Sequence, residues 1–347
     1  MKDIRKISTD ELSLFLTEAG EKRFRIKQIE EWLWQKGVHS FDEMQNLSLS
    51  LREKLKSQFS LEHATISQKV QSNDKSIKFL FTLHDKHTIE GVLIPAGKRV
   101  TACISVQVGC PLKCKFCATG QGEYQRNLHY SEIFDQIILM NRESLLNYDK
   151  EISHVVFMGM GEPLLNYENV KKAIEIFTSQ TGLNRSPSRI TLSTAGIVDK
   201  IGQVADEFPK IGLAISLHSA DKLKREFLMP ITKTNSLENL REALRDYYEK
   251  TKQRISIEYL LLSGINDSEQ DANKLLQFCK AFPVKINLIP YNSTDLHFQR
   301  ASEKSIQDFK SYLESKNLVV TIRQSRGQDI AAACGQLAGN LRNSIKS

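Results

Sequence analysis

A repeated alternation of apolar strands and helices from about residue 99 onward is the feature that most constrains the fold. The candidate strands are ACISVQV, ISHVVFM, RITLS, LAISL, RISIEYLLL and KINLI, with VVTIRQS as an extra one. Helical stretches of suitable length separate them, for example SEIFDQIILMNRE and DANKLLQFCKAF. Buried apolar strands joined by helices form parallel sheets. The pattern therefore predicts an α/β fold, a partial (β/α)6 barrel resembling a TIM barrel.

Two segments precede this region and predict different structures. Residues 1–65 carry apolar side chains at helical spacing and predict a small helical accessory domain. Within it, FRIKQIEEWLWQKG mixes aromatic and basic side chains, as RNA-contacting helices do, although Trp32 and Trp34 are also expected to be partly buried. Residues 66–98 contain the alternating stretches IKFLFTL and HTIEGVLIP, which predict β-hairpins. The barrel and its C-terminal loop then occupy 99–347.

Composition favours a cytoplasmic enzyme with no membrane partner. The hydrophobic fraction is 40% and the charged fraction 26%, as in ordinary globular proteins. No signal peptide is visible, and no apolar run approaches the roughly 20 residues that span a bilayer. The net charge of +7 is weak support for a nucleic-acid partner. A local excess of basic residues predicts a rim that attracts a polyanion; it consists of Lys98, Arg99, Lys113, Lys115 and Arg126 against Glu123.

Three cysteines, Cys110, Cys114 and Cys117, form a C-x3-C-x2-C pattern in one short loop. Such thiolates suit soft metals and iron–sulfur clusters. A structural zinc site needs a fourth ligand, which His129 or His87 could supply in a zinc knuckle. A [4Fe–4S] cluster held by three cysteines instead leaves one iron open. Phe116 gives the C-x-F-C form typical of radical S-adenosylmethionine (SAM) enzymes and favours the cluster.

Polar and glycine-rich residues follow the predicted strands at their carboxyl ends, where barrel enzymes place their active sites. The cysteine loop follows the first strand, and MGMGEP follows the second. Glycines allow close backbone approach, and a carboxylate accepts from an ammonium group, so this turn resembles the one that radical SAM enzymes use for the amino group of SAM. The later strand ends carry Ser193, Ser216, His218 and Asn292.

Two further cysteines are candidates for chemistry. Cys103 lies on the first strand, and Cys334 lies in the small, glycine-rich run DIAAACGQLAGN that leaves its sulfur accessible. Thiolates at such positions can act as nucleophiles. Cys279, inside the helical QFCKAF, is expected to be a buried hydrophobic residue.

Seven runs together resemble the bacterial dual-specificity ribosomal and transfer RNA adenine-C2 methyltransferases, a family of radical SAM enzymes. They are RVTACISVQVGCPLKCKFCATG, RNLHYSEI, FMGMGEPLLN, TLSTAGI, ISLHS, KINLIPYN and RGQDIAAACGQLAGN. The resemblance covers nearly the whole chain.

The resemblance implies a role for each candidate residue. The cluster ligands would be Cys110, Cys114 and Cys117. SAM would be held by Gly161, Glu162, Ser193, Ser216, Leu217, His218 and Asn292. Cys334 would be the residue that is itself methylated, Cys103 its disulfide partner and Glu90 the acceptor of the C2 proton.

The same resemblance implies cofactors and partners. The cofactors would be a [4Fe–4S] cluster and SAM, with two SAM molecules used per turnover. The substrates would be an adenosine of 23S rRNA in the peptidyl-transferase centre and the adenosine 3′ of the anticodon in tRNA. A flavodoxin-like electron donor and a monomeric enzyme are expected.

Two departures and two alternatives accompany this interpretation. Ala331 stands where the family usually has aspartate, and Val106 where serine is usual; neither has an assigned chemical role, although Ala331 could loosen the loop that carries Cys334. The sister adenine-C8 methyltransferases share the cysteines and the SAM site, but EGVLIP and VQVGCPLKC look more like the C2 group. A non-catalytic, zinc-containing RNA-binding protein is the alternative from another class.

Overall fold

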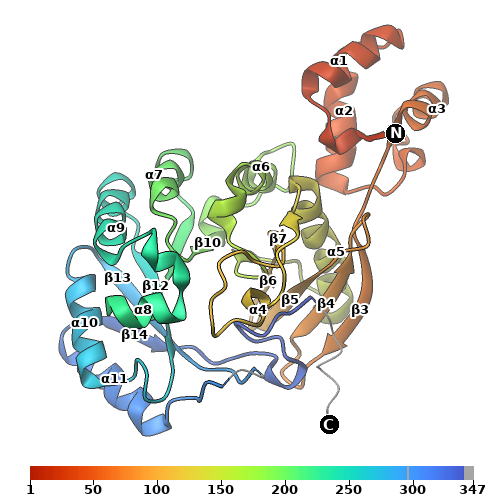
Figure 1. Ribbon diagram of the computed structural model, residues 1–347. Helices are drawn as coiled ribbons and strands as arrows, with labels where there is room; N and C mark the ends of the chain where they lie inside the picture. The colour runs from red at the N-terminus through yellow and green to blue at the C-terminus, as the bar shows by residue number, and fades with distance from the viewer. Residues whose placement is uncertain (295–296, 340–347) are drawn as a thin grey trace.

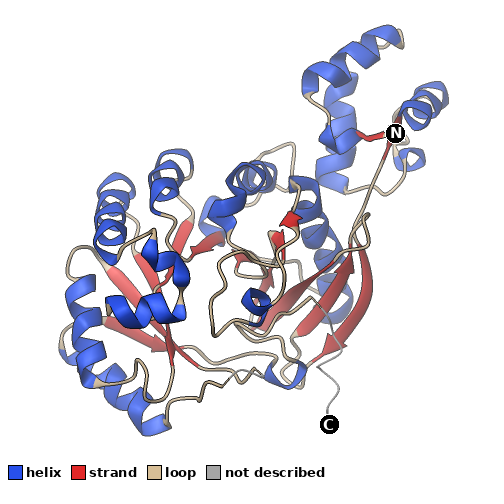
Figure 2. Ribbon diagram, in the orientation of Figure 1, coloured by secondary structure: helices blue, strands red, loops and turns tan. Residues whose placement is uncertain are grey.

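The fold is built on one ten-stranded sheet with an accessory helical unit at its side. The computed structural model describes residues 1–294 and 297–339, so the predicted end of the barrel region at residue 347 lies outside the described part. The strand order is β14-β13-β12-β11-β10-β9-β6-β5-β4-β3. Figure 1 shows the helices of the second half following one another along the outer side of the curved sheet. Helices and strands thus form two layers over most of this region (Figure 2).

Seven neighbouring strands of the sheet are parallel, as the sequence predicts for a partial barrel. They are β6 (Arg99–Cys103), β9 (His154–Phe157), β10 (Ile190–Thr194), β11 (Gly212–Ser216), β12 (Ile255–Leu261), β13 (Val284–Pro290) and β14 (Val319–Ile322). Within the described residues β14 and β3 end the sheet on opposite sides, so the barrel is open. The prediction of a partial barrel is confirmed.

Helices connect these strands at the lengths that parallel crossovers require. They are α5 (Tyr130–Tyr148), α6 (Tyr167–Thr178), α7 (Val198–Glu207), α8 (Lys222–Leu228), α9 (Leu237–Thr251), α10 (Glu269–Cys279) and α11 (Glu303–Ser315). Cys279 is buried at the end of α10, as expected. None of the helices in the described residues combines the length and hydrophobicity that spanning a membrane requires.

Strand β12 shows why the cavity inside the barrel is lined by polar side chains. Side chains of a strand alternate between its two faces. Ile255, Ile257 and Tyr259 are fully buried in the main hydrophobic core, whereas Ser256 and Glu258 line a cavity. The neighbouring strands β10, β11 and β13 also send alternate residues into this cavity. The inner face of the sheet is therefore polar enough to bind a ligand.

The predicted hairpins form the antiparallel side of the sheet. Strand β3 (Thr65–Gln71) pairs with β4 (Ile77–Thr82), β4 with β5 (Thr88–Ala96), and β5 with β6. Glu90 lies opposite Leu80, and Lys78 lies opposite Val92. Lys78 and Glu90 therefore project from the same face of adjacent strands, on residue pairs that lie two positions apart.

The first predicted strand, ACISVQV, is divided into two, which corrects the prediction. Strand β6 ends at Cys103, and Gln107 begins β7 (Gln107–Val108), which pairs with β8 (Arg126–Asn127) in a separate small sheet. Between them the Ser105 N–H donates to the Gln136 side chain at 2.8 Å, and the Val106 N–H donates to the Met160 carbonyl at 2.8 Å. These bonds replace the regular ladder and turn the chain toward the cysteine loop, which ends in α4 (Ala118–Gln121).

The N-terminal unit has a hydrophobic core of its own. It contains β1 (Lys2–Asp3), α1 (Thr9–Glu18), α2 (Arg25–Glu31), a π-helical turn (Trp32–Lys36), α3 (Leu49–Gln58) and β2 (Phe59–Ser60). Ser8 and Glu11 form a capping box that starts α1. Residues from Ile4 to Phe59 make up the separate core. This unit projects from the side of the barrel in Figure 1.

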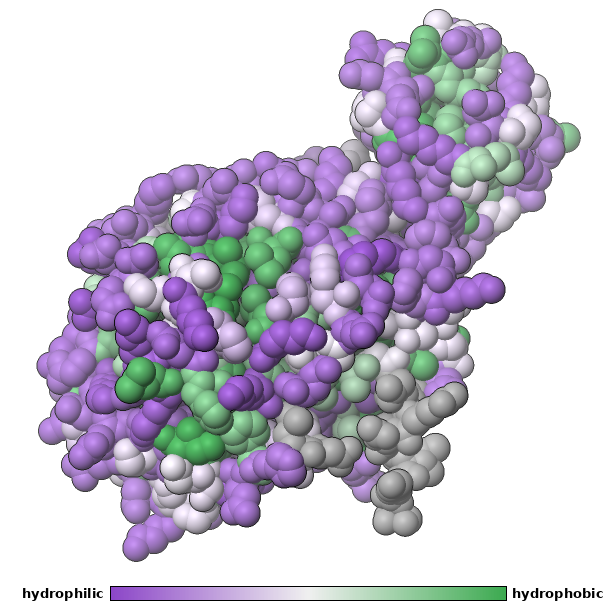
Figure 3. Space-filling view, viewed as in Figure 1, coloured by the Kyte–Doolittle hydropathy of each residue, from purple (hydrophilic) through white to green (hydrophobic). Residues whose placement is uncertain are grey.

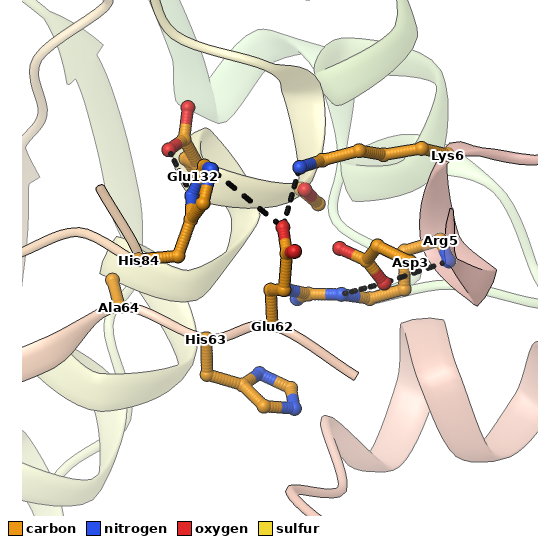
Figure 4. Close-up of a pocket in the computed structure, with 9 residues that line it drawn as sticks. Asp3, Arg5, Lys6, Glu62, His63, Ala64, His84 and Glu132 are labelled. Carbon is orange, nitrogen blue, oxygen red and sulfur yellow. Dashed lines mark hydrogen bonds and ion pairs between the residues drawn. The ribbon is translucent and has the colours of Figure 1, made fainter. Parts of the chain in front are cut away.

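Charged residues connect the N-terminal unit to α5. Arg5 Nη1 lies 2.6 Å from Asp135 Oδ1, and the Ala64 N–H donates to Asp135 Oδ2 at 3.0 Å. Asp3 lies beside Arg5 (Figure 4). We call the contact formed by Asp3, Arg5, Ala64 and Asp135 the joint. The ring of Trp34 also packs against Phe134. The joint is thus a buried polar contact with an aromatic edge.

Candidate active site

A cavity of about 620 Å³ lies inside the open barrel and collects residues from most of its strands. Its size is that of a site for a cofactor or small molecule. Apolar side chains gather in a hollow on the face shown in Figure 3, with hydrophilic side chains around them. This face includes the carboxyl ends of the strands, where the sequence places the candidate residues.

The three cysteines of the predicted cluster loop all line this cavity. The loop packs with Leu112 and Phe116 in a small hydrophobic cluster, and the Lys115 N–H donates to the Leu228 carbonyl at 3.0 Å. Burial raises the pKa of Cys110 to about 12 and raises that of Cys114 well above the ordinary thiol value. A bound metal centre is what would stabilise these buried sulfurs as thiolates.

The donor set fits an iron–sulfur cluster better than a single zinc ion. A cubane bonds each cysteine to a different iron, so the sulfurs need to surround a volume, not a point. Among the described residues no group of three His, Cys, Asp or Glu side chains is arranged to share one ion. The two proposed zinc partners are engaged elsewhere: His129 caps α5, and His87 lies 3.0 Å from Asp85.

The glycine-rich turn after β9 places a carboxylate in the cavity. Gly161 has a φ of +99°, and a Cβ there would come within 2.5 Å of the Gln107 side chain, so the position requires glycine. Glu162 is buried, and burial raises its pKa. Its carboxylate accepts N–H bonds from Leu164 at 3.0 Å and from Ala195 at 2.7 Å. These bonds fix the carboxylate where an ammonium group of a ligand could pair with it.

Ser193, Ser216 and His218 also line the cavity, at the ends of β10 and β11. His218 Nδ1 accepts the Leu260 N–H at 3.0 Å, which leaves the ring proton on Nε2. Burial lowers the pKa of His218 to about 3, so the ring is neutral. Its edge contacts Phe116 of the cysteine loop, with ring centroids 4.7 Å apart. The candidate SAM residues and the cluster loop therefore meet in one site.

Leu217 and Asn292 lie outside the lining of this cavity. Leu217 is fully buried in the core, and its backbone N–H donates to the Glu258 carbonyl at 3.0 Å. The Asn292 amide donates to the Cys334 carbonyl at 3.3 Å and accepts from Gln328 at 2.6 Å. In this structure Asn292 thus holds the segment that carries Cys334.

Arg225 lies behind the cavity wall, and the sequence reasoning did not find its supporting role. The side chain is fully buried, and it donates to the Leu217 carbonyl at 3.1 Å and to the Ala195 carbonyl at 2.7 Å. It therefore joins the loop after β10 to the loop after β11. Its sequence context, KREFL on a short helix, resembles an ordinary solvated arginine and gave no signal.

Cys103 and Cys334 line the same cavity as the cluster loop. Cys103 is buried, and burial raises the pKa of its thiol to about 12; Cys334 is exposed. Both thiols are free, and all six cysteines of the chain are unpaired. The expected Cys103–Cys334 disulfide is therefore not present, and hydrogen bonds hold the segment that carries Cys334 against the cysteine loop. Those bonds include Ala118 N–H to the Gly335 carbonyl at 2.8 Å.

Glu90 lies beneath the C-terminal segment and outside the lining of the main cavity. Its carboxylate is fully buried, with Oε1 2.9 Å from Lys78 Nζ and Oε2 accepting the Ala338 N–H at 2.8 Å. Burial raises the pKa of Glu90, and Lys78 partly opposes this effect. Glu90, the predicted proton acceptor, is thus covered by the segment that carries Cys334, the residue predicted to be methylated.

Arg323 and Glu258 add charge to the cavity wall and were also missed. Arg323 Nη1 lies 3.7 Å from Glu258 Oε2. Burial raises the pKa of Glu258, and the Cys334 sulfur is the main influence that raises the pKa of Arg323. Sequence reasoning could not connect them, because they lie on β12 and just after β14.

The predicted basic rim is only partly available. Arg99 lines the cavity, and Lys98 is exposed. Lys115 lies over the ring of Phe227, 3.7 Å from its centroid. Arg126 forms ion pairs with Asp85 at 2.6 Å and with Glu132 at 2.8 Å, so part of its charge is neutralised within the protein.

Comparison with known proteins identifies the family. The model of the radical SAM superfamily matches residues 104–276, and that of the ribosomal RNA large subunit methyltransferase N-terminal domain matches residues 2–61. A probable dual-specificity RNA methyltransferase RlmN of Christiangramia forsetii is 48% identical and covers 97% of this chain and 96% of its own. The corresponding protein of Thermotoga neapolitana is 44% identical over the full length of both chains.

A solved structure agrees with these relatives. The radical SAM methyltransferase from Sphaerobacter thermophilus is 35% identical, covers 98% of this chain and 100% of its own, and superposes with a TM-score of 0.91. The superfamily match brings with it SAM and an iron–sulfur cluster as cofactors. On these matches, along the whole length from the helical unit to the barrel, the chain belongs to the RlmN family of radical SAM methyltransferases.

Proposed function

We propose that this protein methylates C2 of an adenosine in 23S rRNA and of the adenosine 3′ of the anticodon in tRNA. The observation that carries the proposal is that two free cysteines, Cys103 and Cys334, line the same cavity as the three-cysteine loop. The names of relatives at 44–48% identity, dual-specificity RNA methyltransferases, support RNA as the substrate. C2 of adenine is an electron-poor carbon without a lone pair, so polar methyl transfer alone is unsuited to it.

The cofactors would occupy the cavity wall that the cysteine loop and the glycine-rich turn form. Cys110, Cys114 and Cys117 would hold a [4Fe–4S] cluster, and Glu162 would accept from the ammonium group of SAM. When bound, these cofactors supply a methyl group from one SAM and a 5′-deoxyadenosyl radical from a second. Neutral His218 and the two serines at the strand ends would contact the remainder of SAM.

Cys334 and Cys103 would carry and release the methyl carbon. The Cys334 sulfur takes the methyl group from the SAM sulfonium, so one S–C bond breaks and one forms. That carbon would lose one hydrogen atom to the radical before it joins C2; the electron left over on the ring would be accepted by the cluster, and Glu90 would take the C2 proton. Cys103 sulfur then attacks Cys334 sulfur; the electron pair of the S–C bond stays with the carbon, which takes a proton, and a disulfide remains for a cellular thiol to reduce. Both thiols are free in this structure, as the start of the reaction requires.

RNA would reach the cavity with its adenine unstacked, at a cost of a few kcal/mol. Basic residues at the cavity, among them Arg99, Lys285 and Arg326, would neutralise its phosphates. The N-terminal unit, with residues 1–65 as its predicted extent, would supply a second contact. A monomer in the cytoplasm, served by a flavodoxin-like electron donor, remains the expectation.

Nucleoside analysis tests the reaction. Ribosomal and transfer RNA from cells lacking the endogenous enzyme would be incubated with the holoenzyme, SAM and a reductant, digested and examined by mass spectrometry. We expect 2-methyladenosine in both RNAs and none with Cys334→Ala. Formation of 8-methyladenosine instead would assign the chain to the sister activity, and no methylation by a protein with intact iron content would refute the proposal.

A trapped complex tests the two cysteines separately. In Cys103→Ala purified from cells the disulfide cannot form, so RNA should stay attached to the protein as an RNase-sensitive band on denaturing gels. The Cys103→Ala/Cys334→Ala variant should lack that band. Release of methylated RNA by Cys103→Ala at the normal rate would mean that Cys103 is only a buried strand residue.

A further inference from the structure

Lys78 is a fully buried lysine with no role in the reaction as described so far. It lies on β4 with a relative exposure of 1%, and Glu90 on β5 has an exposure of 0%. Lys78 Nζ is 2.9 Å from Glu90 Oε1, and it donates a hydrogen bond to the Ala331 carbonyl at 3.0 Å. A lysine is rarely buried this completely without a paired charge. Lys78 and Glu90 therefore form a buried ion pair between β4 and β5, beneath the C-terminal segment.

The C-terminal segment forms one hydrogen bond to each member of this pair, on either side of Cys334 in the chain. The Ala331 carbonyl accepts from Lys78, and the Ala338 N–H donates to Glu90 Oε2 at 2.8 Å. Cys334 lies between these two contacts in the chain. The hairpin turn that precedes β4 adds a further anchor, since Ser72 Oγ donates to Asp329 Oδ1 at 2.5 Å. The position of the Cys334 segment is thus fixed against the same two side chains.

The two carboxylate oxygens of Glu90 have different surroundings. Oε2 is occupied by the Ala338 N–H, whereas Oε1 is buried and accepts no well-aligned hydrogen bond from any described residue. Its close neighbour is the Lys78 ammonium, in ion-pair contact. The ion pair with Lys78 engages one lone pair of Oε1, and the second lone pair of this oxygen is the position for a proton.

We propose that Lys78 is a positioning residue for Glu90 and, through its ion pair at Oε1, holds the carboxylate under the Cys334 segment to take the C2 proton of adenine. The inference deepens the proposed function and rests on it. In that step the C2–H bond breaks, its electron pair stays in the ring, and the proton goes to Glu90 Oε1. The ammonium stays in place and stabilises the carboxylate until the transfer occurs.

Among the groups that face Glu90, Lys78 is the one whose positive charge favours the ionised carboxylate. From β4 comes Lys78, from the C-terminal segment the N–H groups of Ala338 and Gly339, and from the loop after β9 the sulfur of Met160, which the Glu90 N–H contacts at 3.4 Å. On β6, Cys103 lies opposite Val92, and burial raises the pKa of its thiol to about 12, so it is neutral at neutral pH. Burial raises the pKa of Glu90, and Lys78 is the positive charge that lowers it. Without that charge the carboxyl would hold its proton at higher pH.

Substitution of Lys78 tests this role in the holoenzyme. Lys78→Met and Lys78→Gln remove the charge, the second keeping an amide donor, and Lys78→Arg keeps the charge. Lys69→Met, at an exposed lysine of β3, is the matched control. Two quantities would be followed between pH 6 and 9: the rate of 2-methyladenosine formation, and the fraction of Cys334 methylated in protein from cells, by peptide mass spectrometry.

We expect the neutral variants to keep methylated Cys334 at the wild-type level but to lose RNA methylation at the acid end of the range. Below the pKa of Glu90 the loss should be about tenfold for each unit by which that pKa rises, because the fraction of ionised carboxylate falls by that factor. Activity should recover as pH rises, with the acid limb displaced upward by about one unit or more. Lys78→Arg and Lys69→Met should keep the wild-type limb.

Three outcomes would overturn the assignment of Lys78. They are an unchanged acid limb in both neutral variants, an equal displacement in Lys78→Arg, and a loss of activity at all pH values with no alkaline recovery, which is what purely structural support predicts. Failure of the proposed function itself would look different, because wild-type enzyme would then lack methylated Cys334 or form no 2-methyladenosine.

Discussion

Two buried ion pairs of this chain differ in what surrounds their carboxylates. At the joint, both oxygens of Asp135 accept hydrogen bonds, from Arg5 and from the Ala64 N–H. Burial alone would raise the pKa of Asp135, but Arg5 and His63 lower it below the ordinary value. Under the cavity, Glu90 has one oxygen without a well-aligned donor, and burial raises its pKa above the ordinary value.

The comparison indicates how a structural pair is distinguished from a reactive one. A fully bonded carboxylate is stabilised as the anion and resists protonation. A carboxylate that is buried with fewer well-aligned hydrogen bonds is closer in free energy to its protonated form, as a general base must be. Burial and a short ion-pair distance are common to both, so neither identifies function by itself.

The largest expected effect lies on the cavity side. Cys114→Ala should abolish iron binding and RNA methylation, because two thiolates hold a cubane poorly. Iron content and visible absorption of the purified protein would be measured, with Cys279→Ala as the control because that thiol is buried away from the cavity. Full iron content in Cys114→Ala would remove the cysteine loop from the site.

The next effect lies at the joint. Asp135→Ala leaves Arg5 buried without its partner and should lower the free energy of unfolding by about 3–5 kcal/mol. Asp206→Ala, which breaks an exposed pair with Lys250, should cost about 1 kcal/mol or less. Denaturant unfolding measures both. Equal small losses would mean that the joint is no more important than a surface ion pair.

The pH dependence of stability separates the two carboxylates further. Because the folded pKa of Asp135 is lowered, its stabilisation is present above the unfolded value of about 3.9 and is lost as pH falls through the folded pKa. The stability difference between wild type and Asp135→Asn should therefore shrink in acid below about pH 4. For Glu90, whose folded pKa is raised, acid relieves an ionisation penalty and gives no such loss. A difference for Asp135→Asn that grows in acid would contradict this sign.

The smallest expected effect concerns the segment over Glu90. Ala331 has a φ of +50°, a left-handed conformation that is costly for alanine. Ala331→Gly should stabilise the protein by about 0.5 kcal/mol, whereas Ala333→Gly, at a residue without positive φ, should destabilise it by about 1 kcal/mol. Thermal unfolding of the two variants measures the contrast. Destabilisation of the same size in both would show that the strain is absent in solution.

Much of the fold could be predicted because it depends on local pattern. Alternating and apolar runs predicted the hairpins and the parallel strands, and the order of the chain placed the strand ends together. The division of ACISVQV could not be predicted, since it depends on the Ser105 N–H bonding to Gln136, a residue on α5. Such a side-chain bond has no signature in the strand itself.

Site residues that belong to a sequence motif could be predicted, whereas residues whose role depends on partners far along the chain could not. The cysteine loop and the turn at Gly161 were recognisable from spacing. Lys78 was not, because in IKFLFTL it reads as a solvated lysine, while its partners are Glu90 and, from far along the chain, the Ala331 carbonyl. Arg225 and Arg323 were missed for the same reason. Val106 is buried in the region where the strand is divided, and Ala331 is strained yet still bonded.

The C-terminal segment has a consequence for how the holoenzyme is assembled. Its contacts with Ala118 and Thr119 cover the end of the cysteine loop, and those with Lys78 and Glu90 cover the barrel floor. A ribosome makes the cysteine loop long before it makes this segment. We therefore expect a period during synthesis when the barrel is formed and its metal site is still uncovered. The cofactor should enter more easily if it is inserted in this period than after the C-terminal segment has closed over the site.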